Sequence, residues 1–362
     1  MRIAFDVSPL SHPRTGIGNY LRGSLAGLLE AAAAGGGHEV VAFAPTSVRG
    51  LRAIPAALAG IPVELRLRPF PWSHRVRMAW SRRARPPVER FLGPVDVLHF
   101  SDWMYPPQRD GVRATTIHDL VPLRFPEWTT PRTREMHGEK YANAAATCDV
   151  VFANSAYTAA DVVERLGIPA ERVRVAPPGL GPGFAPDGDR ADLGRPYVLA
   201  LGTSEPRKNV ARLVEAWRLL DGDLGLALAG GEGWGEQAAP ADAGIRRLGY
   251  VPDADVPQLL RGAAAFVYPS LFEGFGMPVV EAMASGTPVV ASAHPSLDEA
   301  CGDAAVRVDP LDPEAIAAGI REAVERRDEL VPRGLEHARR FTWRAVGETF
   351  LAGYREARER AS

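Results

Sequence analysis

Residues 267–292 read VYPSLFEGFGMPVVEAMASGTPVVAS, and this stretch decides the predicted fold. An apolar run comes before a turn with two glycines, and a second apolar run comes after a stretch of helical character. Pro278 suits the first turn of a helix, because its ring fixes φ and that position needs no N–H. We therefore predict a helix that starts near Met277 and ends near Gly286, between two buried parallel strands.

Short β-rich runs alternate with longer helical runs along the rest of the chain. The expected strands are RIAFDV, EVVAFA, DVLHF, ATTIHD and DVVFAN in the first half, and YVLALG, LGLALAG, AAAFVYP, TPVVAS and AAVRV in the second. This alternation is typical of an α/β protein with doubly wound parallel sheets. Half of residues 177–196 are Pro or Gly, which indicates a linker or a long surface loop. With strands on both sides of it, we expect two Rossmann-like domains joined by this hinge.

The length of 362 residues also favours two domains, because a single core rarely grows to that size. We place the first domain at residues 1–180 and the linker at 181–196. The second domain then covers residues 197–341, and a last amphipathic helix covers 342–362.

Composition excludes several classes of protein. A formal net charge of −2 gives no general attraction to nucleic acid. Cys148 and Cys301 have no CxxC partner, so neither a disulfide framework nor a zinc site is expected. The N-terminal residues lack the apolar run of a signal peptide, and no segment has about 18 uninterrupted apolar residues. We predict a cytoplasmic protein.

Two carboxylates, Glu273 and Glu281, flank the glycines of the opening stretch. Gly274 and Gly276 allow the backbone to approach a ligand closely, and the helix that follows offers its N-terminus to an anion. Carboxylates accept paired hydrogen bonds from vicinal hydroxyls. The pattern therefore predicts two diols separated by a diphosphate, as in a nucleotide sugar. The alternative is one helix-capping glutamate and one surface glutamate.

Arg207 and Lys208 follow the expected strand YVLAL, where the chain turns into a helix. Two adjacent cations at the end of a strand suit a diphosphate, although they could also be solvated surface charges. Acidic DxD strings at 187–189, 221–223 and 253–255 fall in the linker and in loops, where they act as turn formers. We expect no metal, because the two cations and the helix dipole can neutralise the diphosphate.

Gly16 and Gly18 lie between the first strand and the first helix. The third glycine of a dinucleotide fingerprint is replaced by Leu21, so we expect a glycine loop that approaches a phosphate or sugar. A simple tight turn is the alternative. His118 ends the strand ATTIHD and would face a ligand at the carboxyl edge of the sheet, unless it is a structural histidine.

Together these motifs resemble glycosyltransferase family 4, which consists of retaining enzymes of the GT-B fold. The most specific match is EGFGMPVVEAMASGTPVV, which fits the E-x7-E signature of that family. TGIGNY, the HD after a strand, ANSAYTAADV, GTSEPRKN and LGYVPDADVPQLLRGA are also similar, so the resemblance covers nearly the whole chain. It implies two Rossmann-like domains that face each other across a cleft, with the C-terminal helix crossing back to the first.

The resemblance also implies roles for the second-domain residues. Glu281 would bind the ribose hydroxyls, and Glu273 would bind the donor sugar. Arg207 and Lys208 would stabilise the leaving diphosphate. The backbone N–H groups that assist Glu273 would come from Phe275, Gly276 and Met277.

Further implied roles concern the base pocket and the first domain. Tyr250 and Val251 would line the pocket of the base. His118 would lie beside the donor sugar and help to stabilise the transition state. Gly16 and Gly18 would let the first domain close over the phosphates.

The implied function is metal-independent transfer of a hexose, with retention, from a nucleotide sugar to a glycan or lipid-linked acceptor in bacterial polysaccharide biosynthesis. GDP-mannose is the first choice of donor, which suggests a mannosyltransferase, and UDP-sugars are the second. No cofactor is expected. The alternatives are a nucleotide-sugar-binding protein without activity, an epimerase of the same fold, and an NAD-dependent dehydrogenase, which the broken glycine fingerprint weakens.

The acceptor side is marked by a basic and aromatic stretch, RLRPFPWSHRVRMAWSRRARPP, at residues 66–87. Clustered arginines with Phe70, Trp72 and Trp80 suit an anionic membrane surface or a lipid-diphosphate acceptor. We predict peripheral contact with the inner face of the cell membrane through Arg66–Arg85. A solvated loop and helix is the alternative.

Overall fold

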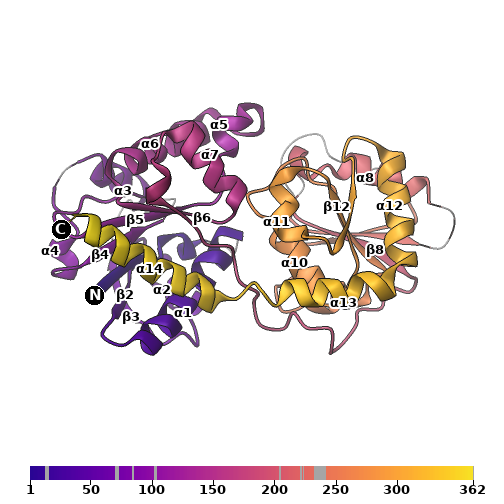
Figure 1. The fold of residues 1–362 in the computed structure, drawn as a ribbon, viewed down its shortest axis with the longest axis horizontal. Coiled ribbons are helices and arrows are strands. Elements are labelled where there is room, and N and C mark those ends of the chain that lie inside the picture. The colour runs from indigo at the N-terminus through magenta and orange to yellow at the C-terminus, as the bar shows by residue number, and fades with distance from the viewer. Residues whose placement is uncertain are drawn as a thin grey trace. The chain divides into compact units, whose positions relative to one another are not determined.

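The computed structural model describes residues 1–12, 16–69, 73–83, 85–101, 104–203, 205–220, 222, 224–231 and 242–361. The chain forms two compact units (Figure 1). Unit 1 contains Met1–Gly179 together with Phe341–Ser362, and unit 2 contains Leu180–Arg340. Residues 181–196, expected as a separate linker, therefore group with unit 2.

Unit 1 is built on a parallel sheet of seven strands in the order β3-β2-β1-β4-β5-β6-β7. The strands are β1 (Arg2–Asp6), β2 (Glu39–Thr46), β3 (Glu64–Pro69), β4 (Val97–Phe100), β5 (Val112–Ile117), β6 (Val150–Ala153) and β7 (Val173–Val175). The central strands are buried along almost their whole length, as expected for a parallel sheet with helices on both faces.

The helices of unit 1 include one from the far end of the chain. They are α1 (Gly16–Gly35), α2 (Gly50–Ala57), α3 (Ser73–Arg82), α4 (Glu89–Leu92), α5 (Val121–Arg124), α6 (Pro131–Thr147), α7 (Ala156–Leu166) and α14 (Trp343–Ala361). α14 lies beside α1, and its Phe350 and Tyr354 belong to the same core as Leu25 of α1 (Figure 1). The predicted return of the C-terminal helix to the first domain is confirmed.

Glycines allow α1 and α14 to touch through their backbones. A Cβ on Gly347 would lie 2.1 Å from the carbonyl oxygen of Gly27, and a Cβ on Gly27 would lie 1.7 Å from that of Trp343. Neither contact leaves room for a methyl group. The two helices therefore approach more closely than side chains at these positions would permit.

Unit 2 is built on a second parallel sheet, in the order β10-β9-β8-β11-β12-β13. The strands are β8 (Tyr197–Leu201), β9 (Gly225–Ala229), β10 (Ile245–Gly249), β11 (Ala265–Tyr268), β12 (Val289–Ser292) and β13 (Ala305–Val308). The helices are α8 (Val210–Arg218), α9 (Val256–Gly262), α10 (Met277–Ala284), α11 (Asp298–Cys301), α12 (Pro313–Glu325) and α13 (Arg327–Ala338). The strand order reverses between β8 and β11, and ligands of such sheets bind beyond the carboxyl ends at that point.

The predicted α/β class with two parallel sheets is confirmed, and each of the ten expected strands is present. Three further strands, β3, β7 and β10, were not predicted. α10 begins at Met277 as expected but ends at Ala284, two residues before Gly286. No helix within the described residues is long and apolar enough to span a membrane.

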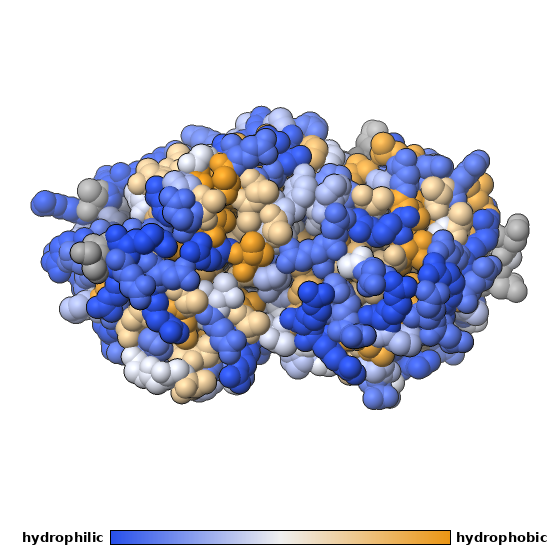
Figure 2. All heavy atoms as spheres, viewed as in Figure 1, coloured by the Kyte–Doolittle hydropathy of each residue, from blue (hydrophilic) through white to orange (hydrophobic). Residues whose placement is uncertain are grey.

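The molecular face drawn in Figure 2 is mostly hydrophilic, and its hydrophobic residues form small, separate groups. The large apolar residues that are exposed in the described part of the chain are also dispersed along the sequence: Val48, Leu123, Leu219, Tyr250 and Leu311. Isolated apolar residues of this kind are normal on a protein surface.

Candidate functional site

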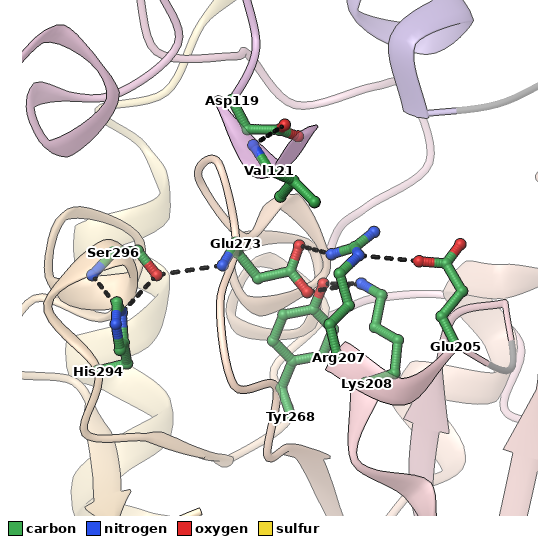
Figure 3. Close-up of polar contacts among 9 residues, drawn as sticks. All are labelled: Asp119, Val121, Glu205, Arg207, Lys208, Tyr268, Glu273, His294 and Ser296. Carbon is green, nitrogen blue, oxygen red and sulfur yellow. Dashed lines mark hydrogen bonds and ion pairs between the residues drawn. The ribbon is translucent and has the colours of Figure 1, made fainter. Parts of the chain in front are cut away.

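The carboxylate of Glu273 binds both predicted cations at the switch point of unit 2 (Figure 3). Its Oε2 lies 2.6 Å from Nη1 of Arg207, and its Oε1 lies 2.7 Å from Nζ of Lys208. The Arg207 guanidinium is held from its other side by Glu205, 2.8 Å from Nε. Glu273 follows β11, and the two cations follow β8, so neighbouring central strands deliver all three residues.

Electrostatics keep this cluster ionised. Burial alone would raise the pKa of Glu273, but Arg207 and Lys208 outweigh burial and lower the pKa to about 2. Burial lowers the pKa of Lys208, and the charge of Glu273 opposes that change. Glu273 is therefore a carboxylate at neutral pH, and it holds two cations in place at the end of the sheet.

The loop that carries the cations has a defined local structure. Pro206–Lys208 form a single 3-10 turn, and Asn209 then adopts the left-handed conformation (φ 58°) before α8 begins. Asparagine tolerates this conformation better than most residues. Its side-chain amide donates to the carbonyl of Pro269, and the carbonyl of Arg207 accepts from the N–H of Leu271. Both bonds join this loop to the one after β11.

Tyr268, the last residue of β11, is the main partner of Lys208 that the sequence did not reveal. The Lys208 ammonium donates to the Tyr268 hydroxyl at 2.6 Å and lies 4.7 Å from the centre of the ring (Figure 3). The ring thus gives a cation–π contact in addition to the hydrogen bond. Tyr268 was placed in an expected strand, but no periodicity reveals a hydrogen bond from the end of one strand to the loop that follows another.

A second missed contact supports the backbone of Glu273. Its N–H donates to Oγ of Ser296 at 3.1 Å, and Nδ1 of His294 lies 2.9 Å from the same hydroxyl (Figure 3). Because Ser296 also donates its own N–H to that Nδ1, the histidine nitrogen is an acceptor and the Ser296 hydroxyl points its proton toward it. The Glu273 loop is therefore held from both its side chain and its backbone.

The glycine turn and α10 come directly after Glu273 in the sequence. Phe275 is buried, and Gly276 caps α10 with φ 101°, a conformation that favours glycine. Met277 is the first residue of the helix. A Cβ on Gly276 would also lie only 2.5 Å from Cδ2 of Leu297. Both the conformation and the space therefore require glycine here.

Glu281 lies one turn into α10 and is half-buried. Burial raises its pKa to about 7, and the negative charge of Asp253 contributes to the rise. Asp253 follows Tyr250 and Val251 in the loop after β10, so this loop approaches the Glu281 carboxylate. Tyr250 itself is 64% exposed, which leaves its ring free to stack on a ligand.

The remaining predicted residues lie in unit 1. His118 comes directly after β5, and its ring meets that of Tyr20 edge-to-face at 4.8 Å. Burial and the nearby His137 lower the pKa of His118 to about 4, so its imidazole is neutral at neutral pH. A neutral imidazole can donate a hydrogen bond to a sugar hydroxyl, but it brings no positive charge. The Tyr20 hydroxyl donates to the carbonyl of Ala176, which fixes the ring that His118 contacts.

Gly16 and Gly18 differ from the expectation of a glycine loop. Both lie in the first turn of α1, with Gly16 as its first residue. A Cβ at Gly16 would meet nothing within 4 Å, whereas Gly18 is buried. The prediction of a loop was wrong in this respect, and any N–H group offered to a ligand belongs to the end of a helix.

The structure thus places the candidate residues in two groups. Unit 2 brings together Arg207, Lys208 and Glu273, and α10 with Glu281 follows Glu273 in the sequence. Unit 1 contains His118 and the start of α1. Within the described residues there is no group of three or more His, Cys, Asp or Glu side chains that could hold a metal ion. Of the DxD strings, 221–223 includes two residues outside the described part.

Two family models match the chain and together cover most of it. "Glycosyltransferase Family 4" matches residues 24–182, and "Glycosyl transferases group 1" matches residues 186–342. O-antigen chain mannosyltransferase B of Escherichia coli is 31% identical over 95% of this chain and 96% of its own length. A D-inositol 3-phosphate glycosyltransferase of Thermomonospora curvata is 28% identical over 99% of this chain and 95% of its own.

Solved structures with this fold match over the full length. Sucrose-phosphate synthase from Thermosynechococcus elongatus superposes with a TM-score of 0.70 at 19% identity and covers 100% of both chains. HepE from Anabaena, solved in complex with UDP and glucose, gives a TM-score of 0.66 at 16% identity and covers 97% of this chain and 98% of its own. These similarities concern the fold.

Proposed function

The chain belongs to the group 1 and family 4 glycosyltransferases, and from that premise we propose that it moves a hexose from a nucleotide sugar to a glycan or lipid-linked acceptor. The observation that carries the proposal is the Glu273 carboxylate that binds Arg207 and Lys208 beyond the carboxyl ends of β8 and β11. Cations in this position suit a diphosphate at the place where such sheets bind ligands.

The cluster is organised before any donor arrives. Arg207 and Lys208 are each fixed by at least two contacts, so little reorganisation is needed when a diphosphate binds. As the bond between sugar and phosphate breaks, negative charge grows on the departing nucleoside diphosphate. Two fixed cations stabilise that charge more than they stabilise the intact donor, and this difference accelerates the reaction.

Glu281 and Tyr250 complete the donor site in this proposal. The Glu281 carboxylate accepts hydrogen bonds from the ribose hydroxyls, and the exposed Tyr250 ring with Val251 contacts the base. Glu273 and the N–H groups of the turn that leads into α10 bind hydroxyls of the hexose. His118, as a neutral imidazole, donates a hydrogen bond to the sugar from unit 1.

Transfer proceeds with retention of configuration, without a metal, and with the departing phosphate accepting the proton of the acceptor hydroxyl. GDP-mannose is the first candidate donor, because the relative at 31% identity is described as a mannosyltransferase. UDP-sugars are the second, since HepE was solved with UDP, although that likeness concerns the fold. The name of the same relative also supports an acceptor in bacterial polysaccharide biosynthesis.

Peripheral membrane contact through Arg66–Arg85 is part of the proposal. Within this range, β3 ends at Pro69 and α3 covers Ser73–Arg82, while residues 70–72 and 84 lie outside the described part. Trp80 is buried and donates its indole N–H to the carbonyl of Pro86, so it belongs to the core rather than to a membrane-facing surface. Exposed arginines on β3 and at the end of α3 remain to contact a membrane.

The test is a donor screen by thermal shift, followed by a hydrolysis assay. We expect one nucleotide sugar to raise the melting temperature and to be hydrolysed slowly to a nucleoside diphosphate and free sugar. Stabilisation without hydrolysis or transfer would favour a binding protein, and release of an epimeric nucleotide sugar would favour an epimerase. Stabilisation by NAD alone would overturn the proposal.

A further inference from the structure

A hollow lined by arginines lies at the amino ends of β8 and β11. Glu273 lies beyond the carboxyl ends of the same two strands, at the opposite end of the unit 2 sheet. The volume of the hollow is about 490 Å³, within the range of small-molecule pockets. Four arginines and a single aspartate are among its lining residues: Arg190, Asp192, Arg195, Arg261 and Arg327. The segment before β8, the end of α9 and the start of α13 form its wall.

Two of these arginines are fixed in place by neutral groups. Arg327 donates to the carbonyls of Ala263, Ala264 and Gly286 at 3.1–3.3 Å. Arg261 donates from Nε and Nη1 to the carbonyls of Asp189, Gly183 and Ala185. A guanidinium bound to carbonyls keeps its full positive charge, whereas one bound to a carboxylate is compensated.

Neighbouring arginines show the contrast. Arg326 pairs with Glu322 and Glu329, and Arg333 pairs with Glu329 and Asp303. For Arg190, Arg261 and Arg327, by comparison, the described residues provide no ion pair of that kind. Burial and the nearby charge of Arg190 lower the pKa of Arg327, and the neighbouring Asp328 opposes that change only in part.

The four arginines of the hollow outnumber its single carboxylate, Asp192, and such an excess of like charge costs free energy unless an anion joins the arginines. Guanidinium groups bind phosphate through parallel N–H donors, and donors held in place in advance lose little freedom on binding. Nη2 of Arg261 takes part in none of the described contacts, so its N–H groups are available.

We propose that this hollow is a second binding site, distinct from the Glu273 cluster, for a small ligand that carries phosphate groups. The ligand joins Arg190 and Arg195, on the segment before β8, to Arg261 of α9 and Arg327 of α13. Binding therefore fastens this segment to the two helices. A soluble phosphorylated compound and a phospholipid headgroup share the required chemistry.

The test uses inorganic pyrophosphate and calorimetry on the full chain. Because pyrophosphate can also bind the predicted donor site, the titrations are made in an Arg207→Gln background. Arg190 is the residue to change, since it is exposed and the described structure gives it no hydrogen bond to lose. The matched control is Arg321, another exposed arginine of unit 2, which lies on α12 outside the hollow and donates to the carbonyl of Leu219.

We expect pyrophosphate to bind the Arg207→Gln background, and Arg190→Gln to weaken this binding by about tenfold through loss of a charge-assisted hydrogen bond. Arg190→Glu should abolish it, and Arg321→Gln should leave it unchanged. Absence of binding in the Arg207→Gln background, an equal effect of Arg190→Gln and Arg321→Gln, or no effect of either Arg190 change would overturn the proposal.

A second arm identifies the source of the phosphate. The full chain is floated with phosphatidylcholine vesicles that contain phosphatidylglycerol, with pure phosphatidylcholine vesicles as the control. Flotation that is lost in Arg190→Glu supports a lipid headgroup in the hollow. Flotation that does not depend on Arg190, combined with pyrophosphate binding that does, supports a soluble phosphorylated ligand.

Discussion

The Lys208 ammonium donates a hydrogen bond of 2.6 Å to the Tyr268 hydroxyl while it lies over the same ring. The tyrosine thus orients a cation that it cannot neutralise, and it does so from the end of a buried central strand. Such a contact orients Lys208 without neutralising its charge, unlike the carboxylate of Glu273, which also binds the ammonium.

Tyr268→Phe should therefore lower turnover while the fold is kept. The loss of one hydrogen bond to a charged group, roughly 1.5–3 kcal/mol, corresponds to a decrease of about 10- to 150-fold in kcat/KM if the contact matters fully in the transition state. Tyr197→Phe is the control, because the Tyr197 hydroxyl donates to the carbonyl of Leu259 at the other end of the sheet. That change should reduce thermal stability and leave kcat intact; equal effects on turnover would argue against a positioning role for Tyr268.

The two glutamates should differ in what they affect. Glu281→Gln should weaken nucleoside-diphosphate binding by roughly 1–3 kcal/mol, because the ribose binds similarly in ground and transition states. Glu273→Gln should lower the turnover rate more than it weakens the binding of nucleoside diphosphate. The structure supports this expectation, because removal of the Glu273 charge leaves Arg207 and Lys208 more attractive to a diphosphate. Calorimetry and turnover at saturating donor measure the two effects. The opposite pattern would reverse the assignment.

Nucleotide affinity should depend on pH through Glu281. Burial and Asp253 raise the pKa of Glu281 to about 7, so below that pH the carboxyl is mostly protonated and accepts fewer hydrogen bonds. Affinity should therefore increase severalfold from about pH 6 to about pH 8. The same pH series with Glu281→Gln measures the part of the pH dependence that comes from ionisation of the nucleotide itself, and this part is subtracted. Identical profiles for both proteins would show that Glu281 is not responsible.

Activity should not require a divalent metal. In the proposal, Arg207, Lys208 and the N-terminus of α10 bind the diphosphate in place of a metal, with Glu205 and Glu273 compensating part of the charge of the two side chains. Transfer measured with excess chelator should keep most of its rate. Loss of the rate with chelator, followed by recovery on addition of Mn²⁺ or Mg²⁺, would contradict this expectation.

The contact between α1 and α14 should be sensitive to a single methyl group. Gly347→Ala places a Cβ 2.1 Å from the carbonyl oxygen of Gly27. We expect it to reduce the free energy of unfolding of unit 1 by roughly 1–3 kcal/mol. Gly138→Ala in α6 is the matched control, since a Cβ there meets nothing within 4 Å and alanine favours a helix. Thermal unfolding should show a lower midpoint for the first variant alone.

The sequence predicted the elements that carry a strong local pattern. Buried strands such as β1 and β11, and the helix that begins at Met277, follow from apolar runs, proline and glycine. β3 was missed because its ELRLRP pattern is polar and half-exposed, as befits a strand at the edge of the sheet. β10, with IRRLG at the edge of the other sheet, was missed for the same reason.

The candidate site was predicted by residue but not by contact. Glu273, Arg207 and Lys208 were each chosen for a ligand, and the structure shows that they also bind one another. Sequence spacing could not show this, because 65 residues separate Lys208 from Glu273 and the parallel topology brings them together. The support from Tyr268 and Ser296 depends on the same topology.

The place of α14 has a consequence for how the chain is made. Most of unit 1 is translated first, but Phe350 and Tyr354 of its core emerge from the ribosome only after all of unit 2. Until then α1 exposes the glycine-lined surface that α14 later covers. Unit 2 can therefore finish folding before unit 1 does. The first unit to be synthesised is thus the last to be complete, and a ribosome that stalls within unit 2 leaves unit 1 without part of its core.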